Sequence, residues 1–134
     1  MNNQLAILIS DYQASVGVAV AMMQRSGIPL PATNVDWVVN DIPQHGELEG
    51  GVRYFKHGYG CAVSLPTGTV DFDFGAHGEI DGFDVWRLAD FAGDKLSAYG
   101  FADEDALKKC FEAEVAAGAL TYCGYILYYL ADAT

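Results

Sequence analysis

The spacing of the apolar residues changes at residue 52, and this change limits the fold more than any other feature. Residues 4–26 carry apolar side chains at three- and four-residue steps, which is the period of a helix with a buried face. From residue 52 the period falls to two, which is the alternation of a half-buried strand. The chain therefore combines a long helix with a sheet.

The N-terminal helix is expected to be buried on more than one side. Its main stripe consists of Leu5, Leu8, Ile9, Tyr12, Val16, Ala19, Val20 and Met23. The opposite side is also poor in charge, with Ile7, Ala14, Val18 and Ala21. Gly27 and Pro29 are expected to end the helix.

Three strands joined by tight turns are predicted over residues 52–55, 61–65 and 69–74. In the third strand Val70, Phe72 and Phe74 share one face, and Asp71 and Asp73 share the other. The preceding residues 28–51 are predicted to form a long loop, with a strand only at 35–39. A short strand is also expected at 79–80.

Two shorter helices and a last strand complete the expected fold. Asp84 is predicted to N-cap a helix over 85–92, and a third helix is predicted over 103–117. A final strand is predicted over 125–130. At 134 residues, one hydrophobic core is the simplest solution. The sequence thus predicts a single α+β domain, residues 1–134, in which a small antiparallel meander packs against the long helix and the two shorter ones.

The charge of the chain restricts its partners. Asp and Glu number 18 against seven Lys and Arg, which gives a formal net charge of −11. Repulsion of this size argues against nucleic acid and anionic membranes as ligands and speeds the approach of a cationic protein. Acids outnumber bases 12 to four between Asp71 and Glu114, so we expect the acidic surface there.

The start of the chain and its cysteines indicate a cytoplasmic protein. The first residues contain no basic segment, and Asp11 and Gln13 interrupt the apolar run, so neither a signal peptide nor a membrane helix is expected. Cys61, Cys110 and Cys123 are an odd number without a CxxC pair. Reduced, mostly buried thiols are the expected state.

Five carboxylates between residues 71 and 84 raise the question of a site. A calcium loop starting at Asp71 fails, because Gly82 stands where a bidentate Glu is needed and Ala76 where a turn glycine is needed. Alternating strand acids are most often a solvated sheet face, less often a binding surface and least often catalytic. As candidate partner-binding residues we take Asp71, Asp73, Glu79, Asp81, Trp86 and Asp90.

The neighbours of these acids are assigned structural roles. Asp84 is a cap, and Arg87 is a clamp that pairs with Asp84, Asp90 or a strand acid. Trp86 at such a position is more often core than binding hot spot. His57 is expected to be a hydrogen-bonding residue of the turn.

A metal or nucleophilic site is not expected. His57, Cys61 and His77 provide three zinc ligands where four are needed, and Cys61 has no basic neighbour besides His57 to stabilise a thiolate. The chain contains no phosphate-binding loop, dinucleotide fingerprint or nucleophile elbow. We therefore assign no catalytic residue, no metal and no cofactor.

Three motifs, which follow one another along the chain, resemble those of a known family. Y-F-x-H-G-x-G-C at residues 54–61, T-G-x-V-D-F-D-F-G at 67–75 and G-F-D-x-W-R-L at 82–88 resemble a small bacterial domain family of unknown function. The resemblance covers about residues 50–115, and some members of that family lie near secreted polymorphic toxins.

This neighbourhood implies an immunity protein, a cytoplasmic antitoxin that binds a cognate basic toxin, such as one that attacks nucleic acid, and blocks it. The alternative is a small enzyme or ligand-binding domain with a pocket around His57, Asp71 and Asp73. A third interpretation is an adaptor that binds no toxin.

Overall fold

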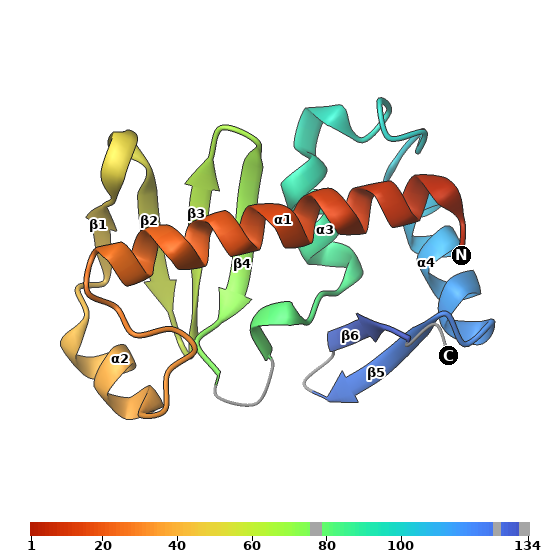
Figure 1. Cartoon of the computed structure of the whole chain (residues 1–134). Helices are drawn as coiled ribbons and strands as arrows, with labels where there is room; N and C mark the ends of the chain where they lie inside the picture. Colours follow the sequence, from red (N-terminus) through yellow and green to blue (C-terminus); the bar gives the residue numbers. More distant parts are fainter. Residues whose placement is uncertain (76–78, 125–126, 132–134) are drawn as a thin grey trace. The chain divides into compact units, whose positions relative to one another are not determined.

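The structure is a computed structural model that describes residues 1–75, 79–124 and 127–131. Contacts within the chain divide it into two compact units, one of residues 13–81 and one of residues 1–12 with 82–134. Helix α1 (Asn3–Arg25) contributes its residues up to Tyr12 to the second unit and the rest to the first. The α+β class, the long N-terminal helix and the antiparallel meander predicted from the sequence are confirmed (Figure 1).

The unit of residues 13–81 is built on a four-stranded antiparallel sheet. Its strands are β1 (His45–Glu47), β2 (Arg53–His57), β3 (Gly60–Leu65) and β4 (Gly68–Asp73), and they lie side by side in that order. Helix α2 (Val35–Asp41) and the short 3₁₀ helices η1 (Glu49–Gly51) and η2 (Glu79–Asp81) complete the unit. The meander thus has one more strand, β1, than the sequence predicted.

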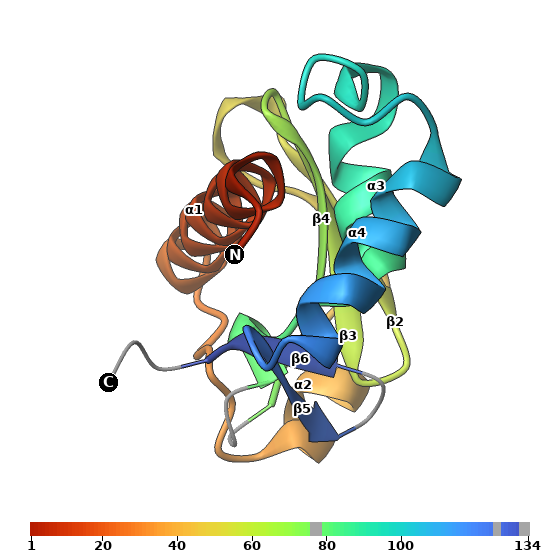
Figure 2. The same ribbon diagram turned by 90° about the vertical axis from the view of Figure 1, so that its right-hand side faces the viewer.

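One face of this sheet, the inner face, packs against the C-terminal half of α1 (Figures 1 and 2). The strands direct alternate side chains to it, and those of Cys61, Val63, Val70 and Phe72 are fully buried. The Cys61 thiol donates to Met23 Sδ of α1 at 3.7 Å, and the hydroxyls of Ser15 and Thr67 are 2.9 Å apart. The predicted burial of alternate residues in the third strand is confirmed.

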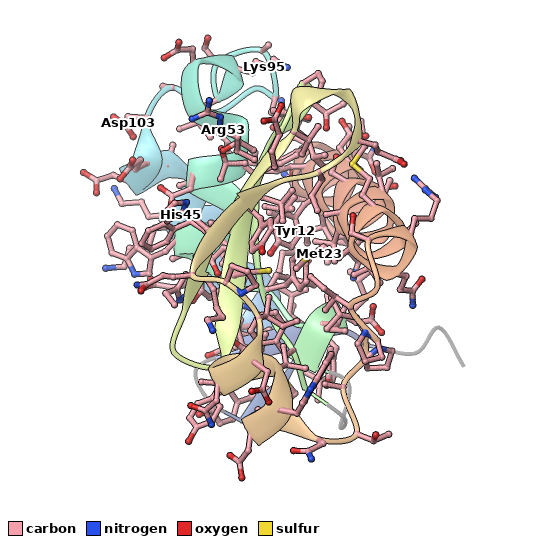
Figure 3. All side chains as sticks on the ribbon, turned by 90° about the vertical axis from the view of Figure 1, so that its left-hand side faces the viewer. Tyr12, Met23, His45, Arg53, Lys95 and Asp103 are labelled. Atoms are coloured by element: carbon pink, nitrogen blue, oxygen red, sulfur yellow. The ribbon has the colours of Figure 1, made fainter. Side chains whose placement is uncertain are left out.

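The other face, the outer face, carries the remaining strand residues. Figure 3 shows the His45 and Arg53 side chains on the side of the sheet away from Met23. Register places Phe55 between His45 and Ala62, and Ala62 between Phe55 and Asp71, so these four residues form one row across the four strands. The outer face is therefore polar, with one aromatic side chain, that of Phe55, at its centre.

The turn between β2 and β3 explains the H-G-x-G-C motif. Gly58 has a φ of +51°, a left-handed conformation that glycine adopts without strain. A Cβ on Gly60 would lie 2.7 Å from the carbonyl oxygen of Phe72 and 2.8 Å from Asp73 Oδ1. The Tyr59 carbonyl also accepts a hydrogen bond from the Phe74 N–H at 2.8 Å. The two glycines therefore let the turn close against β4.

Helix α2 occupies the segment that the sequence predicted as a strand within a long loop, so that prediction is wrong. Asn34 Oδ1 accepts a hydrogen bond from the Trp37 N–H at 3.1 Å and caps the helix. At the other end the Lys56 ammonium donates to the carbonyls of Val39 and Ile42. These two caps, with Val38 fully buried, override the strand preference of the three valines.

The second unit contains α3 (Val85–Ala92), η3 (Gly93–Lys95), α4 (Glu104–Ala116), β5 (Leu120–Gly124) and β6 (Leu127–Leu130). Both predicted helices are confirmed, and Asp84 and Asp103 are their N-caps. The final strand is confirmed at 127–130, whereas residues 125–126 of that prediction lie outside the described residues. The sequence missed β5, and residues 79–80 belong to η2 rather than to a strand.

An aromatic core holds this second unit together. The ring of Phe111 makes edge-to-face contacts with Phe83 and Tyr128, with ring centroids 6.2 and 5.3 Å apart. Phe83 and Tyr128 also exchange two backbone hydrogen bonds, of 3.0 and 2.8 Å. The chain entering α3 is therefore tied to β6.

Helix α1 differs from the sequence prediction in one way. Its second apolar side is not buried, since Ile7 is 56% and Val18 48% exposed. Its 23 residues, with only Asp11 and Arg25 charged, also make it the one helix in the described chain that is long and apolar enough to cross a membrane. Asp11 and Gln13, which interrupt the apolar run in the sequence, lie within this helix, and a core helix can have the same composition.

Gly60 and Gly17 have different surroundings, which predict opposite effects when each is replaced by alanine. Gly60→Ala should lower the free energy of unfolding by about 1–3 kcal/mol, because a backbone carbonyl must move to admit the methyl group. Gly17→Ala should raise it by about 0.5–1 kcal/mol, because this helical glycine has nothing within 4 Å of the added Cβ. Urea unfolding of both variants measures the difference, and equal shifts would contradict the turn geometry.

Candidate functional site

The outer face of the sheet is the first candidate site. An open hollow of about 430 Å³ lies on it, bounded by residues of β1, β2 and β3 that include His45, Glu47, Arg53 and Phe55. The small side chains of Ala62 and Ser64 contribute to its lining and make room for it. Such a surface can hold an apolar group between polar side chains.

His57 and the strand acid Asp71 meet on the same sheet face as this hollow. His57 Nε2 lies 2.9 Å from Asp71 Oδ1, so His57 is the hydrogen-bonding residue expected from the sequence. Asp71 and Asp73 are half-buried on the same face of β4, as predicted. The arrangement joins a histidine to a carboxylate on a rigid sheet.

Cys61 cannot act with His57. His57 is exposed on the outer face, whereas Cys61 is fully buried on the inner face. Burial, together with the charges of Asp71 and Asp73, raises the pKa of the Cys61 thiol far above its ordinary value. A thiolate nucleophile at this position is therefore strongly disfavoured.

Potential metal ligands do not cluster among the described residues. Within them, no three His, Cys, Asp or Glu side chains come together in a group that could hold a metal ion. His77, the third zinc ligand considered from the sequence, lies outside the described residues. The structure thus brings Asp71 to His57 and separates both from Cys61.

Helix α3 carries the second candidate surface. Leu88, Ala89, Phe91 and Ala92 form its buried stripe, and Trp86 and Asp90 lie outside this stripe. Trp86 is 62% exposed, so the interpretation of this residue as core is wrong. Asp90 follows Trp86 by four residues, one helical turn, and is also exposed.

The remaining predicted site residues have structural or separate positions. Asp84 is buried, and its Oδ1 accepts the Arg87 N–H at 2.7 Å, which makes it the predicted cap. The Arg87 guanidinium reaches back to the Gly82 carbonyl at 3.5 Å. Asp81 is exposed at the end of η2, and the side chain of Glu79 lies outside what the structure describes. Trp86 and Asp90 belong to one unit, and Asp71, Asp73 and Asp81 to the other.

Sequence reasoning missed three exposed aromatics of the first unit, Trp37, Phe55 and Tyr59. Trp37 was overlooked because its segment was predicted as a strand. The pattern that could have found it is Asn34 three residues before Trp37, since an N-cap side chain bonds the backbone of that position. No comparable local signal marks Phe55, because sheet alternation does not reveal which outward side chain lies uncovered.

Comparison with known proteins bears on the whole chain. A family described as "Domain of unknown function (DUF6896)" matches residues 5–130. The chain belongs to this family. The DUF6896 match runs from α1 to β6 and so includes elements of both units, well beyond the three motifs. No curated protein and no solved structure matches the chain.

The raised pKa of Cys61 predicts how stability depends on pH. Above the ordinary thiol pKa of 9.0 the unfolded chain loses this proton while the folded protein keeps it. The stability that this group contributes is therefore present below that pH and is lost as the pH rises.

The free energy of unfolding should fall less steeply between about pH 9 and about pH 10 in the Cys61→Ala variant than in the wild type. Urea unfolding across this range measures both slopes. Alkylation of the native protein provides a check, because Cys61 should react more slowly than the half-buried Cys110 and Cys123. Rapid alkylation of Cys61 would contradict its position.

Proposed function

We propose that this chain is an acidic protein-binding domain that binds a cognate basic toxin domain and blocks it, as an immunity protein does. The observation that carries the proposal is the exposed indole of Trp86 on α3, with Asp90 one turn further on. Exposed tryptophans are enriched among the residues that dominate protein–protein binding.

The local contacts of α3 support this role. Within the G-F-D-x-W-R-L motif, Phe83 and Leu88 are core, Asp84 caps the helix and Arg87 bonds the Gly82 carbonyl. The Trp86 side chain, by contrast, points out of the fold. Asp90 forms no ion pair with any residue that the structure describes. An indole and a free carboxylate on a capped helix are thus available to a partner.

The charge supports a basic partner. Residues 13–81 hold eight acids against three Lys and Arg, and residues 1–12 with 82–134 hold ten against four, so both units are acidic. A protein that attacks nucleic acid needs a cationic cleft, which an acidic domain can occupy as a competitor. Charge complementarity accelerates such an association, and a few buried anchors then set how slowly it dissociates.

The proposal predicts that a basic toxin is encoded beside the gene, and the first test uses a candidate found there. The purified proteins should form a complex whose association rate falls steeply as sodium chloride is added, because salt screens the attraction. Trp86→Ala should raise the dissociation rate about tenfold or more. Tyr59→Ala removes an exposed aromatic from the β2–β3 turn and is the matched control. Surface plasmon resonance gives both rates.

The proposal fails if the toxin candidate stays active in the presence of the protein and purification from the native host yields no basic partner. It also fails if the association rate does not depend on salt. If Trp86→Ala leaves the complex unchanged, α3 is not part of the interface.

One observation favours the alternative of a small enzyme or ligand-binding domain. The His57–Asp71 contact lies on the same sheet face as the hollow. Under that alternative His57→Ala and Asp73→Asn should each abolish ligand binding or activity with little change in melting temperature. Thermal unfolding alongside a ligand-binding screen checks this. If either variant mainly loses stability, the residue is structural.

A further inference from the structure

Helix α2 repeats the local arrangement found on α3. The chain has two tryptophans, Trp37 and Trp86, and each is exposed on a short N-capped helix. Each is followed four residues later by an exposed aspartate, Asp41 after Trp37 and Asp90 after Trp86. Side chains at this spacing lie next to each other on a helix surface.

The position of α2 is fixed from several directions. A helix of seven residues is not stable by itself, so its surroundings must hold it. Asn34 caps its start, Lys56 binds the carbonyls of Val39 and Ile42, and Val38 is fully buried. The preceding loop is tied to the end of β4 by a 2.9 Å hydrogen bond from the Ala32 N–H to the Phe74 carbonyl. The helix that carries Trp37 is therefore held in place, and the Trp37 side chain is 39% exposed.

The charges around Trp37 favour a cation. Residues 26–52 contain no Lys or Arg, and Asp36 and Asp41 are exposed. Neither carboxylate forms an ion pair with any described residue. Lys56, at the end of this helix, directs its ammonium to the backbone carbonyls of Val39 and Ile42. An indole face with a carboxylate beside it matches a lysine or arginine side chain, which gains both a cation–π contact and a charged hydrogen bond.

We propose that Trp37 and Asp41 form a second contact point, which takes a lysine or arginine side chain of the basic partner protein. This inference rests on the proposed function, since it names the group that α2 recognises on that partner. Each unit then carries one Trp–Asp contact point.

The test uses Trp37 as its own reporter. In the Trp86→Phe variant Trp37 is the sole tryptophan. An amidated oligo-arginine peptide should change its fluorescence saturably, whereas an oligo-citrulline peptide of equal length, similar in shape but uncharged, should not. Asp41→Asn in this background should weaken binding about threefold or more, because the charged hydrogen bond is lost.

The matched control is Glu112→Gln in the same background. Glu112 is exposed on α4 in the other unit, and this change removes the same charge from the chain. It should leave the affinity at Trp37 unchanged. If Asp41→Asn and Glu112→Gln weaken binding equally, or if the fluorescence does not respond, only general charge attraction acts and the inference is overturned.

The toxin candidate separates the two proposals. If Trp86→Ala weakens the toxin complex and Trp37→Ala does not, the contact at α2 is refuted and the proposed function stands. If both changes weaken it, and circular dichroism shows both variants folded, the inference is supported. If no toxin binds but the peptide still saturates at Trp37 in an Asp41-dependent way, the cation site stands and the toxin proposal fails.

Discussion

The packing of the inner sheet face against α1 is the constraint on which the first unit depends. Cys61, Val63 and Phe72 must face the helix, and the thiol of Cys61 reaches Met23 of α1. Because strand side chains alternate, the same register sends His57, Asp71 and Asp73 to the outer face. A slip of one residue would bury the two aspartates and expose the aromatics, which makes the register strongly specified. The polar outer face is therefore a consequence of how the core is built.

Three cations of the chain, Lys56, Arg25 and Arg87, contact groups of the protein itself. Lys56 binds helix carbonyls, Arg25 pairs with Glu49, and the Arg87 guanidinium turns back to the Gly82 carbonyl. Most acids outside the caps remain at the surface. Because 18 acids stand against only seven Lys and Arg, much of the negative charge at the exterior is uncompensated, which is what a domain that attracts a basic partner requires.

The positions of the two exposed tryptophans depend on the residues that hold their helices. Trp37 is carried by a helix that Asn34 and Lys56 hold at its ends, and Trp86 by one that Asp84 caps and whose Leu88 is buried in the core. An exposed aromatic on a rigid helix loses little conformational entropy when a partner covers it, so these positions suit binding. The segment that matches the DUF6896 family includes both helices, and the description of that family names no activity.

The sequence by itself determined the elements whose signals are local. The period of α1, the alternation in β4 and the cap Asp84 depend on residues within a few positions of one another, and all were predicted correctly. The three valines around Trp37 misled the prediction, because Lys56 and the site that buries Val38 come from distant parts of the chain. Which apolar side chains stay uncovered, such as Trp86 and Val18, was decided only by the tertiary structure. Exposure depends on what packs against each face, and no short stretch of sequence contains that information.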